Sequence, residues 1–256
     1  MANASNGNFI WHEHMTTDPK AAIAFYGEVV GWKTQPFGAD YMMWVGSQGP
    51  LDGVMKLPAH MAKIGVPPHW MGNVQVQDVD ATVALTRKLG GKILKEASDV
   101  PTIGRFAVIA DPQGAPLAVF SPSGAMELHD ASREGEFCWN ELVTSDGGAA
   151  FTFYEELFGW KSIQEMDMGP MGTYRLFGVG EKSLGGMMTA PKGAPRPPMW
   201  GFYTETSDLD AAVARATKLG AKVLNGPMDV PDGARIVQMM DPQGAAFALH
   251  ELPKKR

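Results

Sequence analysis

The chain has 256 residues, 45% of them hydrophobic and 20% charged, so it can fill a core and does not belong to the disordered or fibrous classes. Lys and Arg total 22 against 28 Asp and Glu, a net charge of -6. The basic cluster Lys254–Arg256 is too small for a nucleic-acid site. No apolar run reaches the roughly 20 residues of a membrane helix, and no signal-peptide pattern opens the chain. We expect a cytoplasmic protein without nucleic-acid or membrane partners.

The first part of the chain alternates between strand and helix signals. A strand is predicted over Phe9 to Met15, and Asp18 with Pro19 suits the start of a helix that Gly31 ends. Three short strands follow, around residues 32–37, 41–45 and 53–57. A connector at 64–68 leads to a second round, with a strand at 70–76, a helix at 78–89 and strands near 92, 106 and 117. Each round has the order βαβββ.

The same pattern then repeats. FIWHEHMTTD, which begins at Phe9, matches FCWNELVTSD, which begins at Phe137, and the helix starts DVDA and DLDA match at Asp78 and Asp208. Both halves also carry a DPQGA turn. We therefore predict two homologous domains, residues 8–124 and 134–256, joined by a linker at 125–133. The four helices are expected to begin at the capping residues Asp18, Asp78, Asp146 and Asp208.

The order and spacing of these motifs resemble the vicinal oxygen chelate superfamily, also called the glyoxalase, bleomycin-resistance and extradiol-dioxygenase fold. The resemblance rests on the first strand, the FY…GW block, the DVDA or DLDA helix start and the DPQG turn, and it covers nearly the whole chain twice. It implies an α+β fold in which four βαβββ units form two curved mixed-sheet cups with helices on the outer faces. In this family the cup usually holds a divalent metal and a small substrate.

The resemblance also implies where metal ligands should stand, and this chain has other residues there. The matched positions hold Trp11 and Trp139, Met71 and Gly201, and Ala118 and Ala248. None of these side chains is a ligand for a hard or borderline cation, so we expect no metal cofactor at the usual site. An unusual site at His12, Glu13 and His14 stays open, although strand alternation places Glu13 on the face opposite the two histidines.

Polar residues on the predicted cup faces are the candidates for chemistry. The catalytic candidates are Glu13, Glu141 and His250, and the ligand-binding candidates are Trp11, Met71, Asn73, Trp139, Tyr203, Glu205 and Arg235. A carboxyl group among Trp, Met and Phe would be desolvated, which raises its pKa and suits it to acid or base catalysis. Alternatively, each Glu accepts hydrogen bonds and only fixes strand geometry. The lone Cys138 is expected to be a small buried hydrophobe without a histidine beside it.

Three classes of function follow. The first is a protein that binds a small organic molecule in an apolar cup rich in Met and Trp, for sequestration, resistance or metabolite handling. The second is a glyoxalase-like lyase or isomerase that uses Glu as its base, and the third is a noncatalytic interaction scaffold. A monomer or a homodimer is compatible with two domains in one chain. The sequence leaves open whether the βαβββ units pair within a half or across halves.

Overall fold

The computed structural model describes residues 6–38, 40–126, 128–193 and 197–253, so the basic cluster Lys254–Arg256 lies outside the described residues. The first half contains two βαβββ modules. Module 1 consists of β1 (Phe9–Thr16), α1 (Pro19–Val29), β2 (Lys33–Pro36), β3 (Tyr41–Gly46) and β4 (Gly49–Lys56). Module 2 consists of β5 (His69–Gln75), α3 (Val79–Lys88), β6 (Lys92–Val100), β7 (Gly104–Ala110) and β8 (Pro116–Pro122). A short helix that the sequence did not predict, α2 (Ala59–Lys63), connects the two modules.

The second half repeats this order. Module 3 consists of β9 (Phe137–Thr144), α4 (Gly147–Phe158), β10 (Lys161–Asp167), β11 (Thr173–Val179) and β12 (Lys182–Thr189), with a short 3₁₀ turn at Gly169–Met171. Module 4 consists of β13 (Met199–Glu205), α5 (Leu209–Lys218), β14 (Lys222–Asp229), β15 (Arg235–Met240) and β16 (Ala246–Glu251). The predicted α+β class with four βαβββ units is confirmed. Among the described residues, no helix combines the length and apolar character needed to cross a membrane.

All four predicted helix caps are confirmed. The side chains of Asp18, Asp78, Asp146 and Asp208 each accept a hydrogen bond from the backbone N–H three residues later. These carboxylates satisfy a helix N–H group that would otherwise have no partner. The four aspartates are therefore structural residues.

Hydrogen bonding arranges the strands in two eight-stranded mixed sheets, one from each half of the chain. The strand orders are β2-β3-β4-β1-β5-β8-β7-β6 and β10-β11-β12-β9-β13-β16-β15-β14. Within each module the first and last strands are parallel neighbours, as in β1 with β4 and β13 with β16. The other neighbours within each module are antiparallel, as in β3 with β4 and β15 with β16.

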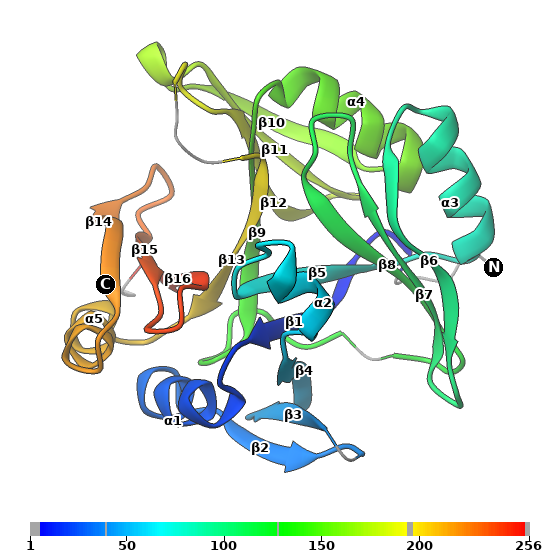
Figure 1. The fold of residues 1–256 in the computed structure, drawn as a ribbon. Coiled ribbons are helices and arrows are strands. Elements are labelled where there is room, and N and C mark those ends of the chain that lie inside the picture. Colours follow the sequence, from blue (N-terminus) through cyan, green and yellow to red (C-terminus); the bar gives the residue numbers. More distant parts are fainter. Residues whose placement is uncertain (1–5, 39, 127, 194–196, 254–256) are drawn as a thin grey trace. The chain divides into compact units, whose positions relative to one another are not determined.

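The compact units of the structure do not coincide with the two halves of the sequence. The first unit is built mainly from Met71–Leu128 and Trp139–Gly201, which are modules 2 and 3. The second unit contains Trp11–Trp70, the short segment His129–Cys138 and the described residues from Phe202 onward, so it combines modules 1 and 4. Figure 1 shows α3 with α4 in the first unit and α1 with α5 in the second. The modules therefore pack across halves.

A buried tyrosine joins the two modules of each unit. In the first unit the Tyr154 hydroxyl on α4 lies 3.2 Å from Oδ2 of Asp111, and the Trp200 indole N–H donates to the Tyr154 oxygen at 3.2 Å. The other carboxylate oxygen of Asp111 accepts the backbone N–H groups of Gly114 and Ala115. The aspartate of the DPQG turn thus closes its own turn and also binds a helix from the other half of the sequence.

The second unit repeats this arrangement. The Tyr26 hydroxyl on α1 lies 3.2 Å from Oδ2 of Asp241, and the Trp70 indole N–H donates to the Tyr26 oxygen at 3.0 Å. Tyr26 is 1% exposed and Asp241 is 4% exposed, so water does not replace these bonds. A buried polar group without a hydrogen-bond partner costs free energy. Each tyrosine–aspartate bond therefore favours the pairing of these two modules over an arrangement that leaves either group unpaired.

Replacing Tyr154 by Phe tests the link in the first unit. We expect Tyr154→Phe to lower the free energy of unfolding by about 1–3 kcal/mol, because Asp111 and the Trp200 indole would both lose a buried partner. Urea denaturation measures the change. The control is Thr152→Ala, an exposed position on the same helix, where a change within about 0.5 kcal/mol is expected. Equal effects of the two substitutions would contradict the assigned role.

Candidate functional site

Two matching clusters of Trp, Tyr and Glu stand at equivalent places in the repeat. In the Glu13 cluster, the Trp11 indole N–H donates to the Tyr41 hydroxyl at 3.1 Å, and that hydroxyl donates to Oε2 of Glu13 at 2.9 Å. Trp11 and Glu13 lie on β1, and Tyr41 lies on β3. Strand alternation correctly places Trp11 and Glu13 on one face, whereas Tyr41 was not among the predicted site residues.

The Glu141 cluster has the same chain of donors. The Trp139 indole N–H donates to the Tyr174 hydroxyl at 3.0 Å, and the hydroxyl donates to Oε1 of Glu141 at 3.0 Å. Trp139 and Glu141 lie on β9, and Tyr174 lies on β11. The two clusters belong to different compact units, the Glu13 cluster to the second and the Glu141 cluster to the first. Each cluster is complete within its own unit.

A glycine on the intervening strand makes room for each tyrosine. Gly53 on β4 is in register with Glu13, and a Cβ atom there would lie 1.9 Å from the Tyr41 hydroxyl oxygen. Gly186 on β12 is in register with Glu141, and its Cβ would lie 2.1 Å from Cζ of Tyr174. A glycine inside a strand often marks such a close approach. Gly53 and Gly186 open the segments GVMKLP and GMMTAP, which match each other in the two halves of the sequence.

Burial controls the charge of Glu13. Desolvation raises the pKa of Glu13 from its ordinary 4.5 to about 8, and the hydrogen bond from Tyr41 opposes this rise. The nearby carboxylate of Asp52 adds a smaller upward shift, and Trp11 adds a downward one. Oε1 of Glu13 is buried without a hydrogen-bond partner among the described residues. Glu13 therefore holds its proton near neutral pH, unlike an exposed carboxyl group.

The two histidines beside Glu13 point into packed surroundings. The His12 backbone N–H donates to Asp52, and its ring stacks on Phe137 with centroids 3.9 Å apart. His14 is fully buried, stacks on Trp70 and has its Nε2 atom 3.5 Å from Asp241. Desolvation lowers the pKa of His14. In the described part of the chain, His12, Glu13 and His14 do not bring ligand atoms together into a group that could hold a metal ion.

The candidates on β13 and β16 form a third group in the second unit. Glu205 and His250 are cross-strand neighbours, and Nδ1 of His250 lies 2.6 Å from Oε2 of Glu205. Nearby, the Gln238 amide donates to the Tyr203 hydroxyl at 2.6 Å. The Cys138 thiol is directed at the Tyr203 carbonyl oxygen, 3.3 Å away. Contrary to the sequence-based expectation, Cys138 has a histidine close by, because its ligand atom and those of Glu205 and His250 all lie within 4.8 Å of one another.

The remaining candidates are placed as follows. Arg235 forms two hydrogen bonds of 2.9 Å with Asp210 and a third of 3.3 Å with Glu251, so its guanidinium group is already held by two carboxylates. Met71 and Asn73 are buried on β5 in the first unit, 6% and 9% exposed.

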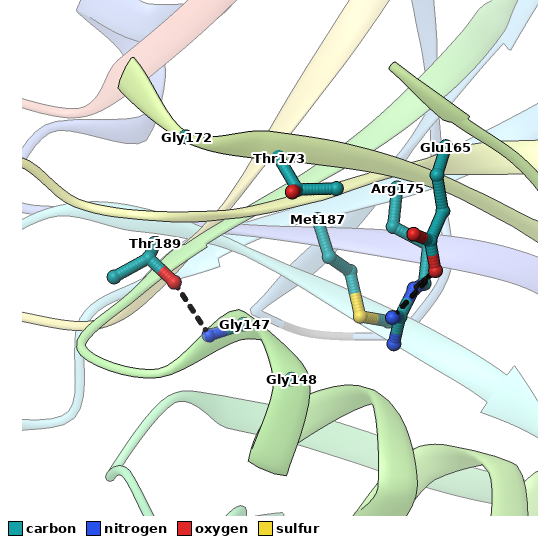
Figure 2. Close-up of a pocket in the computed structure, with 8 residues that line it drawn as sticks. All are labelled: Gly147, Gly148, Glu165, Gly172, Thr173, Arg175, Met187 and Thr189. Carbon is teal, nitrogen blue, oxygen red and sulfur yellow. Dashed lines mark hydrogen bonds and ion pairs between the residues drawn. The ribbon is translucent and has the colours of Figure 1, made fainter. Parts of the chain in front are cut away.

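A pocket of about 260 Å³ lies in module 3 (Figure 2). Its lining residues are Gly147, Gly148, Glu165, Gly172, Thr173, Arg175, Met187 and Thr189. Thr173 and Arg175 flank Tyr174 along β11, so they point to the face opposite the Glu141 cluster. Arg175 is ion-paired with Glu165 at 2.7 Å and lies over the Phe151 ring. None of the predicted site residues lines this pocket.

Comparisons with known proteins match both halves of the chain. Residues 12–120 match the family described as "Glyoxalase-like domain", and residues 138–249 match the "Glyoxalase/Bleomycin resistance protein/Dioxygenase superfamily". A Mycobacterium tuberculosis protein named "Putative glyoxylase CFP32" is 31% identical over 245 residues, covering 93% of this chain and 92% of the relative. The anthracycline biosynthesis protein DnrV of Streptomyces peucetius is 32% identical over 270 residues, covering 98% of this chain and 96% of the relative.

Solved structures show the same fold at lower identity. The Mn(II)-bound glyoxalase from Novosphingobium aromaticivorans superposes with a TM-score of 0.66 at 13% identity, covering 96% of this chain and 82% of that one. A dioxygenase from Sphingomonas wittichii, which acts on 2,2',3-trihydroxybiphenyl, gives a TM-score of 0.67 at 14% identity, covering 96% and 90%. At this level of identity the likeness concerns the fold.

The raised pKa of Glu13 predicts a pH-dependent stability. Because the folded-state pKa of about 8 lies above the ordinary 4.5, the folded chain binds this proton more tightly than the unfolded chain. The free energy of unfolding of the parent protein, relative to that of Glu13→Gln, should therefore be greatest below pH 4.5. It should fall by up to about 1.4 kcal/mol per pH unit as the pH rises to 8. Urea denaturation of both proteins between pH 5 and pH 8 measures this difference.

The control for this experiment is Glu96→Gln, which removes an exposed carboxylate that is paired with Arg87. Its unfolding free energy relative to the parent protein should stay nearly constant from pH 5 to pH 8. The unfolding free energies of the parent protein and Glu13→Gln could also differ by a constant amount from pH 5 to pH 8. That result would show that Glu13 ionises like an exposed carboxyl group.

Proposed function

Because the chain belongs to the glyoxalase/bleomycin resistance protein/dioxygenase superfamily, we propose that it binds a small organic molecule beside its two Trp–Tyr–Glu clusters, without the metal that the fold usually holds. The role would be sequestration, resistance or metabolite handling. The observation that carries this proposal is the duplication of the Glu13 cluster in the Glu141 cluster. Both clusters have the same hydrogen-bond donors and acceptors and a glycine that makes room for the tyrosine.

The residues at the family's metal positions do not fit a metal ion. The indole nitrogen of tryptophan can only donate a hydrogen bond and offers no lone pair to a metal ion. In both clusters its N–H already donates to the tyrosine hydroxyl. Ala118, Ala248 and Gly201 have no side-chain atom that could bind a metal ion. These identities argue for a site built from aromatic rings and a carboxyl group.

The chemistry of the clusters favours a planar aromatic ligand that carries carbonyl or hydroxyl groups. Trp11 and Trp139 are both partly exposed and offer ring faces for stacking. A protonated Glu13 can take part in hydrogen bonds without bringing a charge into an apolar site. The similarity to a protein named for anthracycline biosynthesis supports the same class of polycyclic ligand.

The test is a titration with a hydroxyanthraquinone, followed by quenching of tryptophan fluorescence and by calorimetry. We expect saturable binding at pH 7 that weakens above pH 8 as Glu13 ionises. Trp11→Ala should weaken binding about tenfold, roughly 1.4 kcal/mol, by removing a stacking face. Trp139→Ala tests the second cluster in the same way. Arg105→Ala, whose side chain pairs with Asp80 and Asp99 on the surface, serves as the control and should bind like the parent protein.

Two results would overturn this proposal. One is the absence of saturable binding by the parent protein. The other is binding that survives both Trp11→Ala and Trp139→Ala unchanged, because the ligand would then sit away from both clusters. Glu13→Gln should keep binding at pH 7 and lose the decline above pH 8, since the amide stays neutral.

An enzymatic role for the same residues is the second candidate. A carboxyl group with a pKa of about 8 is suited to proton transfer near neutral pH, which favours a glyoxalase-like lyase or isomerase with Glu13 as base. In that case Glu13→Gln should lower turnover of methylglyoxal with glutathione by about 100-fold or more. Glu141 is the alternative base, so Glu141→Gln is measured beside it. Turnover that is absent in the parent protein, or unchanged in both Glu13→Gln and Glu141→Gln, would remove this candidate and leave the binding proposal standing.

A further inference from the structure

Three side chains with metal-binding atoms converge in the second unit, and none of the three stands at one of the family's metal positions. Glu205 and His250 are direct cross-strand neighbours on β13 and β16, so their side chains share one face. Backbone hydrogen bonds from Gly135 to Glu205 and from Glu205 to Glu136 place the start of β9 beside the end of β13. This pairing brings Cys138 next to Tyr203 and within reach of the other two side chains.

We propose that Cys138, Glu205 and His250 form a binding site for one divalent transition-metal ion of the zinc type. The three residues offer one sulfur, one oxygen and one nitrogen ligand, the combination that borderline cations such as Zn²⁺ prefer. Three protein ligands leave a fourth tetrahedral position for water or a small ligand, which is the pattern of reactive zinc sites. This site is separate from the two Trp–Tyr–Glu clusters and does not depend on the proposed function.

The distances suit metal binding after a small adjustment. Zinc bonds of about 2.3 Å to sulfur and about 2.0 Å to nitrogen and oxygen require ligand atoms roughly 3.3–3.6 Å apart in a tetrahedron. The ligand atoms here all lie within 4.8 Å of one another, and Nδ1 of His250 is 2.6 Å from Glu205. The ion would replace the direct His250–Glu205 hydrogen bond and the thiol proton of Cys138, which is released on binding.

The surroundings support a fixed site with access for an ion. The Glu205 side chain is 6% exposed, and its Oε1 atom accepts the backbone N–H of Leu252 at 3.0 Å. That second bond orients the carboxylate and leaves Oε2 toward His250. The imidazole of His250 is 14% exposed, so one side of the cluster reaches solvent.

Only one half of the sequence carries these ligands. The equivalent positions in the first half are Ile10, Gln75 and Phe120, whose side chains do not supply this sulfur, oxygen and nitrogen set. The site is also distinct from Trp139, Gly201 and Ala248, the residues at the family's metal positions in this half. One ion per chain is therefore expected.

Cobalt(II) is the probe for this site, because a cobalt–thiolate bond gives a near-ultraviolet charge-transfer absorption. We expect the 256-residue chain, without an affinity tag, to bind one Co²⁺ with this absorption and to release it to Zn²⁺. Mass spectrometry of dialysed zinc-loaded protein should give one zinc per chain. Cys138→Ser should abolish the thiolate absorption and weaken binding at least tenfold, and His250→Ala should weaken binding to a similar extent.

His60→Ala is the matched control, because His60 on α2 lies outside the cluster and is exposed. It should bind Co²⁺ like the parent protein, with the same thiolate absorption. Circular dichroism checks that the variants fold, and Cys138→Ala provides a second variant that keeps the Glu205–His250 pair intact. Two results would overturn the proposal. One is that the parent protein binds no cobalt. The other is that both Cys138 variants keep the thiolate absorption and the stoichiometry of the parent protein.

Discussion

A tyrosine hydroxyl buried inside a protein needs a partner, and this requirement underlies the exchange of modules in this chain. Tyr26 and Tyr154 lie on the helices of modules 1 and 3, and each finds its aspartate in a module of the other half. The same aspartates close the DPQG turns with their second oxygen. Both oxygens of each carboxylate are therefore committed, one to a local turn and one to a distant helix.

The pairing of β9 with β13, inside the sheet of the second half, brings a further set of side chains together. Cys138 belongs by sequence to the first strand of the second half, yet the compact units group it with module 4, where Glu205 and His250 stand. Trp139, the next residue, belongs to the other unit, where it bonds with Tyr174. One strand, β9, thus contributes neighbouring residues to a Trp–Tyr–Glu cluster and to the Cys–Glu–His group.

Local patterns in the sequence predict local features of the structure well. The four capping aspartates, the βαβββ order and the shared face of Trp11 and Glu13 follow from hydrogen-bonding needs and strand alternation, which act within about ten residues. Tyr41 was not found because its meeting with Glu13 depends on how β3, β4 and β1 line up, and on the missing side chain of Gly53. The closeness of Cys138 and His250 was not found either, because 112 residues separate them in the chain. Only the strand pairing brings them together.

The two halves of the sequence keep one feature and differ in another. Both halves contain the same Trp, Tyr and Glu with the same hydrogen bonds, and the same glycine beside the tyrosine. The duplicated feature is therefore a whole cluster and not a single residue. Gln75 and Phe120 stand where the second half has Glu205 and His250, so the ion-pairing group exists once. A buried acid beside a histidine is costly unless the pair is matched in charge and hydrogen bonding. Gln75 and Phe120 avoid that cost, so of these two sets of equivalent positions only Glu205 and His250 have to match a buried carboxylate with a histidine.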